Sequence, residues 1–185
     1  MVYFAPKIKL KFAPSGNTFG YMGSKNQSFS VMQATRSHLS QICELENRIF
    51  SRGPEIFSRA RLRSLLSSPN ATFFLLCDHE YPVGYGIALK NKLRNGLDKG
   101  RIYLIGVILE HRSKGAGSLL LGAMEEFLMK SGVAVIVLET LNNEDGAESF
   151  FIKHGYGEPQ LLPNYYPYCY PYGDAVRLRK VISKR

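Results

Sequence analysis

A glycine-containing turn near the middle of the chain has the residue types that bind an anion. It runs Arg112-Ser-Lys-Gly-Ala-Gly-Ser118, between an apolar, strand-like run that ends at Leu109 and a segment of helical spacing. Glycines let the backbone turn tightly and leave amide groups unobstructed, and the first amides of a helix have no partner within it. Arg112 and Lys114 add positive charge. We therefore expect this turn to hold an anionic group, such as the pyrophosphate of a cofactor.

The histidines and cysteines are scattered along the chain. The 4 histidines and 3 cysteines show no metal-ligand spacing, so we predict no metal site. Cys43, Cys77 and Cys169 lie far apart and are odd in number, which favours reduced thiols in a cytosolic protein. His154 closes a short helical segment, where interaction with the helix dipole is expected.

The elements that must position the turn follow a regular order from Ser28 onward. Apolar spacing predicts a strand, two helices, three strands, a helix, a strand, a helix and two final strands. The predicted bounds are 28–34 for the first strand, 37–50 for the first helix, a second helix that Pro54 opens, strands at 72–77, 81–89 and 102–109, a helix at 114–131, a strand at 133–138 and a short helix that ends near His154. This alternation indicates one α/β domain.

Length and charge narrow the possibilities further. The chain has 185 residues and a formal net charge of +9. Residues 1–27 form a basic N-terminal extension, either an edge strand or a flexible tail, and residues 28–185 form the domain. No apolar run approaches the roughly 20 residues that span a bilayer, and the start lacks a signal peptide. We expect a soluble, cytoplasmic protein with no membrane or nucleic-acid partner.

The order of elements, together with the Arg112-x-x-Gly115-x-Gly117 turn, resembles the GNAT superfamily of acetyl-CoA-dependent N-acetyltransferases. Within it the chain is most similar to the RimI-like branch, which acetylates ribosomal-protein alanine. The matching segments are Val137-Leu138-Glu139, His154-Gly155-Tyr156, Asn164-Tyr165-Tyr166-Pro167 and Asp174-Ala175-Val176. The resemblance covers about residues 29–182. It implies a GNAT fold, with a mixed, mostly antiparallel sheet that splays at the cofactor site and carries helices on both faces.

The resemblance also implies which residues bind acetyl-CoA as co-substrate. The backbone of Ile105, Gly106 and Val107 would contact the pantetheine arm, and the turn would hold the pyrophosphate. Asn143 follows the second central strand, near where the family often places a cofactor-contacting asparagine, although Glu144 occupies the aligned position. The full expected set is Ile105, Gly106, Val107, Arg112, Ser113, Lys114, Gly115, Ala116, Gly117, Ser118, Asn143 and Phe151.

The catalytic groups that the resemblance implies include one departure from the family pattern. Glu139 takes the position of the general base, acting through water, and the Val107 amide takes that of the oxyanion donor. The branch has a tyrosine as general acid where this chain has Phe151. Tyr156, Tyr165 or Tyr166 could substitute for it, water could protonate the thiolate, or the domain could be catalytically weak. We select Glu139, Tyr156 and Tyr166 as the catalytic candidates.

The acceptor is the least determined part of the function. A primary amine is expected, and a protein N-terminal α-amino group is one candidate. The branch's Pro-Trp-Ser element is replaced here by residues 50–54, and the chain contains no tryptophan. Acetylation of a small-molecule amine and a catalytically weak CoA-binding module therefore remain alternatives. Monomer and homodimer both remain open.

Overall fold

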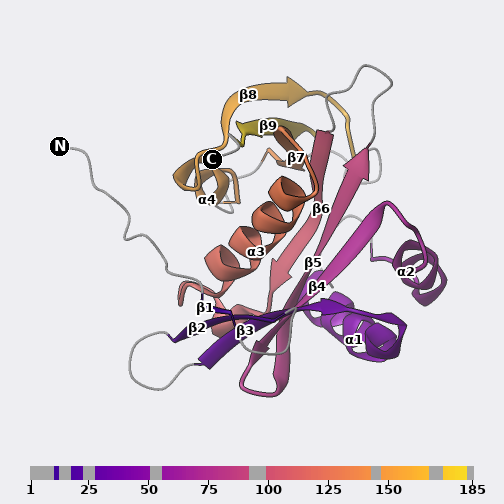
Figure 1. The fold of residues 1–185 in the computed structure, drawn as a ribbon. Helices are drawn as coiled ribbons and strands as arrows, with labels where there is room; N and C mark the ends of the chain where they lie inside the picture. The colour runs from indigo at the N-terminus through magenta and orange to yellow at the C-terminus, as the bar shows by residue number, and fades with distance from the viewer. Residues whose placement is uncertain are drawn as a thin grey trace.

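The computed structural model describes residues 11–12, 18–22, 28–50, 56–91, 99–142, 147–166 and 173–182. In these residues nine strands form one sheet in the order β1-β2-β3-β4-β5-β6-β7-β9-β8 (Figure 1). Neighbouring strands are antiparallel except β6 and β7, which are parallel. The strands are β1 (Lys11–Phe12), β2 (Thr18–Met22), β3 (Ser28–Ala34), β4 (Ala71–Asp78), β5 (Tyr81–Asn91), β6 (Lys99–Val107), β7 (Val135–Leu141), β8 (Gly157–Leu162) and β9 (Ala175–Val181).

Helices cover both faces of this sheet, as the resemblance implies. They are α1 (Leu39–Phe50), α2 (Arg59–Leu66), α3 (Ala116–Lys130) and α4 (Ala147–Lys153), with short 3₁₀ helices η1 (Arg36–His38) and η2 (Leu109–His111). Figure 1 shows α3 lying across β5 and β6. A Cβ atom on Gly86 of β5 would lie 2.5 Å from Met124 Sδ of α3, so this face of β5 points to α3. The preceding residue, Tyr85, points to α1 on the opposite face.

A β-bulge in β6 changes which face its side chains occupy. Ile87 pairs with Leu104 and Ala88 with Ile102, which leaves Tyr103 as the extra residue. A bulge interrupts the strict alternation of side chains along a strand. Before it, a Cβ on Gly100 would meet Leu128 of α3 at 2.9 Å. After it, a Cβ on Gly106 would meet Ile49 of α1 at 2.6 Å, and Tyr103 itself stacks on Phe57 beside α2.

The two parallel strands separate partway along their length. Their pairing runs from Lys99 with Val135 to Ile102 with Leu138. Beyond that point β6 continues beside β5 as far as Val107, and β7 continues beside β9 as far as Leu141. This divergence confirms the splayed central sheet. We call the region between the two strands beyond their last pair, Ile102 with Leu138, the gap.

Details at the element ends differ from the sequence-based expectation. The first helix begins at Leu39 and not at residue 37, because Ser37 lies inside η1, which Thr35 precedes. The second helix begins at Arg59, and the Ser58 hydroxyl caps it by accepting from the Arg61 amide at 3.2 Å. Pro54 lies outside the described residues. Within the N-terminal extension, β2 pairs with β3 and β1 with β2. No helix in the described parts of the chain is long and apolar enough to cross a membrane.

Candidate active site

The glycine turn connects β6 to α3 and presents free backbone amides. Ser113 and Gly115 both have left-handed backbone angles, with φ of 59° and 83°. The first bond of α3 runs from the Leu119 amide to the Gly115 carbonyl, at 3.0 Å. The amides of residues 116–118 therefore have no carbonyl acceptor within the helix. Residues 112–115 are exposed, so the turn and the positive end of the helix dipole are open to an anion.

Two contacts fix this turn to its neighbours. Arg112 Nε donates to the Val107 carbonyl at 2.9 Å, which holds the turn against the end of β6. On the other side, His154 Nε2 lies 2.9 Å from the Ser118 hydroxyl oxygen, and its Nδ1 lies 2.7 Å from the Phe150 carbonyl. Because a carbonyl only accepts, Nδ1 carries a proton, and Nε2 is the atom that orients the Ser118 hydroxyl.

α4 also packs directly on the first turn of α3. A Cβ on Gly117 would lie 3.5 Å from the Phe150 ring, and that ring lies 4.4 Å from the His154 ring. The position of Phe150 beside the turn and the contact between His154 and Ser118 were not predicted from the sequence. The only available signal was the spacing of Phe150 and His154, which places them on one helix face.

The part of β6 that borders the gap offers backbone groups at alternate residues. The Ile108 amide donates to the Val83 carbonyl of β5 at 2.9 Å. In an antiparallel ladder the backbone amides of successive residues point alternately toward and away from the partner strand. The amides of Val107 and Ile105 therefore point away from β5, toward the gap. Gly106 pairs with Tyr85 of β5 instead. Of the three predicted contacts, the geometry gives free amides to Ile105 and Val107 and gives Gly106 a packing role against α1.

Glu139 lies where the two strands separate, and two arginines hold it. Its side chain is only 4% exposed. Oε1 accepts from Arg177 Nε at 2.9 Å, and Oε2 lies 2.7 Å from Arg101 Nη2 without the alignment of a hydrogen bond. Arg177 is the cross-strand neighbour of Glu139 on β9, and Arg101 belongs to β6. We call Arg101, Glu139 and Arg177 the arginine clamp. It places two positive charges around one negative charge.

Aromatic residues complete the surroundings of the clamp. The Tyr165 hydroxyl accepts from Arg101 Nη2 at 2.8 Å, and the Arg101 guanidinium lies 5.3 Å from the centre of the Tyr103 ring. The Tyr166 ring lies 5.0 Å from that of Tyr165, and the Tyr166 amide donates to the Gly173 carbonyl at 2.8 Å. The structure thus brings Glu139 and Tyr166 to one region, with Tyr165 between Arg101 and Tyr166.

The structure does not bring Tyr156 to this region. Its side chain is 2% exposed. Burial, followed by the nearby charge of Glu125, raises the pKa of the Tyr156 hydroxyl. The hydroxyl faces Glu125 without hydrogen-bond alignment, and Lys180, which pairs with Glu125 at 2.7 Å, lies 5.4 Å from the ring centre. Glu125 belongs to the second half of α3, so Tyr156 faces away from the glycine turn.

The two remaining predicted residues have different outcomes. Phe151 is 6% exposed, with ring centres 5.2 Å from Phe150 and 5.6 Å from Tyr156. It lies in the apolar core between Phe150, which contacts the turn, and the buried Tyr156. Asn143 lies outside the described residues, so its predicted contact with the cofactor stays a prediction.

A buried acid on the opposite face was not predicted from the sequence. Glu46 of α1 is 1% exposed, accepts from the Tyr85 hydroxyl and accepts from the Phe57 amide at 2.7 Å. Burial raises the pKa of Glu46, although both hydrogen bonds oppose that shift. Burial and the Glu46 charge raise the pKa of Tyr85. These bonds tie α1, β5 and the segment before α2 together behind Gly106.

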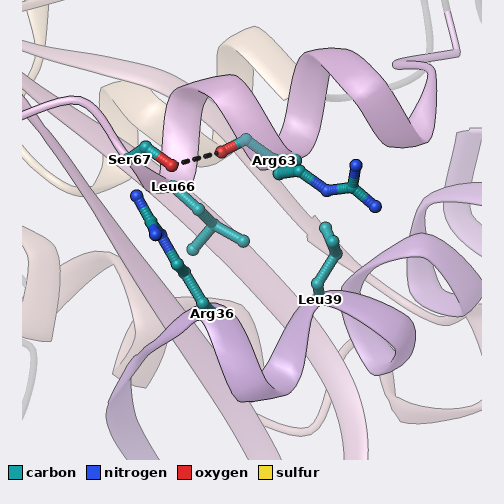
Figure 2. A pocket seen from close by; sticks show the side chains of 5 residues that line it. All are labelled: Arg36, Leu39, Arg63, Leu66 and Ser67. Carbon is teal, nitrogen blue, oxygen red and sulfur yellow. Dashed lines mark hydrogen bonds between the residues drawn. The ribbon is translucent and has the colours of Figure 1, made fainter.

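A surface hollow elsewhere has a different character. It has a volume of about 280 Å³ and lies between the start of α1 and the end of α2, lined by Arg36, Leu39, Arg63, Leu66 and Ser67 (Figure 2). Ser67 Oγ donates to the Arg63 carbonyl at 2.9 Å, which closes the end of α2. None of the lining residues belongs to β6, β7 or the glycine turn. We therefore place the candidate active site at the gap and not in this hollow.

Comparisons with known proteins show the family of this chain and its fold. A family model described as "Acetyltransferase (GNAT) family" matches residues 39–156. N-alpha-acetyltransferase 30 of Schizosaccharomyces pombe is 24% identical over 137 residues, which cover 74% of this chain and 89% of that protein. Arabidopsis thaliana Naa50, solved with the bisubstrate analogue CoA-Ac-MVNAL, has a TM-score of 0.71 at 22% identity and covers 83% of this chain and 99% of its own. The Escherichia coli ribosomal-protein-S18-alanine N-acetyltransferase has a TM-score of 0.71 at 20% identity, and the match covers 85% of this chain and 96% of that protein.

Proposed function

We propose an acceptor and a chemical mechanism for this chain, which belongs to the GNAT acetyltransferase family and uses acetyl-CoA as its acyl donor. The proposed acceptor is a primary amine, with a protein N-terminal α-amino group as the leading candidate. The names of the relatives support that candidate, since the yeast protein is an N-alpha-acetyltransferase and the Naa50 analogue carries a peptide. The observation that carries the proposal is the gap between β6 and β7 beside the glycine turn.

The residues at the gap suit the two halves of the donor. The amides of residues 116–118 and the charges of Arg112 and Lys114 would hold the pyrophosphate, because they combine a helix N-terminus with formal positive charge. The outward amides of Ile105 and Val107 would bind the pantetheine arm and the acyl oxygen. When bound, acetyl-CoA supplies an acyl carbon that is activated toward attack. The Val107 amide would stabilise the negative charge that develops on the acyl oxygen.

Glu139 would remove the proton of the attacking amine through one water molecule. Both carboxylate oxygens already face guanidinium groups, so a bridging water suits this site better than direct contact with the amine. Proton transfer by a positioned group contributes about 10²–10⁴-fold in rate. The clamp fixes the carboxylate at the mouth of the gap, which keeps the water in one orientation.

A phenol beside the clamp would protonate the leaving thiolate. Tyr165 suits this role because its hydroxyl oxygen accepts a hydrogen bond from Arg101. The hydroxyl proton is therefore not used in that bond and can be donated to the thiolate. Tyr166 lies next to it. Tyr156 is buried against Glu125 and suits the role less well. Substituting Tyr165 and Tyr166 by phenylalanine, singly and together, separates these roles, with Tyr156→Phe as the comparison.

Mass spectrometry of acetyl transfer tests the proposal. The full chain is incubated with acetyl-CoA and with three sets of acceptors: short peptides with free N-termini, polyamines and aminoglycosides. Acetylation of peptides at the α-amino group supports the proposal. Transfer only to the small amines moves the function to the first alternative. Calorimetry that detects no binding of acetyl-CoA rejects the proposed site.

The second candidate function is a CoA-binding module without transfer activity. Two observations favour it: Phe151 carries no hydroxyl, and Glu139 is held by two arginines. This candidate predicts calorimetric binding of acetyl-CoA with no transfer to any acceptor, and a Glu139→Gln substitution that leaves cofactor affinity unchanged. Detectable turnover that Glu139→Gln reduces excludes it.

A further inference from the structure

We propose that the acceptor carries a carboxylate close to its amine, and that Arg177, positioned by the rest of the arginine clamp, recognises that carboxylate. This inference rests on the proposed function, because it names the class of amine that the same site accepts. A peptide with an acidic residue in its first two positions fits this description. It makes Arg177 a specificity-determining residue.

The arginine clamp gives the gap a positive charge. An amine acceptor is a cation in water before it loses its proton. The clamp has two guanidiniums and one carboxylate, so its net charge is positive where that cation must arrive. Like charges disfavour each other most where water is partly excluded. A carboxylate on the acceptor would convert this repulsion into attraction.

Arg177 keeps donors that Glu139 does not use. Within the described part of the chain, the polar contact of its guanidinium is the single bond from Nε to Glu139. Its side chain is 41% exposed, whereas that of Glu139 is 4% exposed. The two terminal nitrogens of a guanidinium match a carboxylate in a two-bond fork. Arg177 therefore keeps its binding edge for a second anion while Glu139 fixes its inner edge.

Arg101 has a different role from Arg177, because its contacts hold the clamp in place. It touches Glu139, donates to the Tyr165 hydroxyl and lies over the Tyr103 ring. Its side chain is 28% exposed, less than that of Arg177. With these three contacts Arg101 neutralises much of the Glu139 charge, which leaves Arg177 free to attract another carboxylate.

The clamp lies on the face of the sheet opposite to α3. Tyr103 stacks on Phe57, which lies just before α2, at a ring separation of 5.7 Å. The clamp therefore occupies the face that α1 and α2 cover, and α3 with the glycine turn occupies the other face. Donor and acceptor would then approach the gap from opposite faces, and Arg177, as the cross-strand neighbour of Glu139, lies on the face that the acceptor approaches.

Matched peptides test the inference. Pairs of peptides share every residue except the first or second, which is Asp or Glu in one member and Asn or Gln in the other. The ratio of kcat/KM within each pair, measured by mass spectrometry, is independent of the fraction of folded enzyme. We expect the acidic member of the best pair to be preferred at least tenfold. Arg177→Gln should reduce that preference to less than threefold, and Arg177→Lys should give an intermediate value.

Arg179→Gln is the control, because Arg179 lies on the same strand and pairs with the exposed Glu158 of β8. It should leave the preference unchanged. Equal or better turnover of the amide members by the unmodified protein overturns the inference and leaves the proposed function intact. An acidic preference that Arg177→Gln does not change overturns the role of Arg177. Failure to acetylate any peptide or small amine overturns the proposed function and this inference with it.

Discussion

Replacing Glu139 by glutamine tests whether this residue is a structural anchor as well as a base. The substitution keeps the shape and removes the charge that two guanidiniums share. Breaking a fully buried ion pair from one side costs about 3–5 kcal/mol, and an exposed pair is worth about 0–1 kcal/mol. Glu139 is 4% exposed but its partners are 28% and 41% exposed. We therefore expect a loss of about 2–3 kcal/mol.

For a chain of this size, 1 kcal/mol corresponds to about 2–4 °C in Tm, so Glu139→Gln should lower the Tm by about 4–12 °C in thermal denaturation followed by circular dichroism. Glu158→Gln is the matched control, because Glu158 pairs with an arginine of β9 on the surface, and it should cost about 1 kcal/mol or less. Adding Arg177→Gln to Glu139→Gln should recover part of the loss, because it removes one of the two repelling cations.

The same variant should lose about 10²–10⁴-fold in kcat if Glu139 also positions the proton-accepting water. The two effects separate the two roles. An unchanged Tm with a large loss of kcat would refute the anchoring role. A lowered Tm with normal kcat, measured below the unfolding range, would refute the role in proton transfer.

Three further predictions follow from the turn and from the buried acid. Gly115→Ala should lower the free energy of unfolding by about 1–2 kcal/mol, because φ of Gly115 is 83°; since no atom lies within 4 Å of the new Cβ, the backbone angle is the only source of the cost. Calorimetry should also show weaker acetyl-CoA binding by this variant. The control, Gly122→Ala, lies in equally open space inside α3 and should stabilise the protein by about 0.5–1 kcal/mol. His154→Ala removes the group that orients the Ser118 hydroxyl and should weaken acetyl-CoA binding by about tenfold; an unchanged Kd would contradict that role. Burial raises the pKa of Glu46, so its contribution to stability is present below the ordinary pKa of a glutamate and is lost as pH rises through the raised pKa. Urea unfolding at several pH values should therefore show Glu46→Gln gaining stability relative to the unmodified protein as pH rises above about 4.5, and a difference that does not vary with pH would count against this account.

The fold could be predicted because its signals are local. The run at 133–138 and the spacing at 114–131 gave β7 and α3 to within a few residues, since apolar periodicity reports burial within one element. The glycine turn was predicted for the same reason: its residue types, its strand and its helix are contiguous.

The arginine clamp could not be predicted because it depends on the pairing of three strands. Glu139 and Arg177 are 38 residues apart, and only the register of β7 with β9 makes them neighbours. Burial of Glu46 beside Tyr85 is the same kind of contact, across 39 residues. A single sequence carries no signal for such registers, so the residue predicted as a base was found without its two partners.

The extra residue in β6 has a consequence for how this enzyme can change. Gly100 and Gly106 are six positions apart, and in an uninterrupted strand they would share one face. The offset at Tyr103 turns them to opposite sides, so that one makes room for Leu128 and the other for Ile49. Deletion of Ile102 would move Arg101 into the position of that residue, on the face that α3 covers, and would take it away from Glu139. Substitutions in this strand can therefore be tolerated where insertions and deletions cannot.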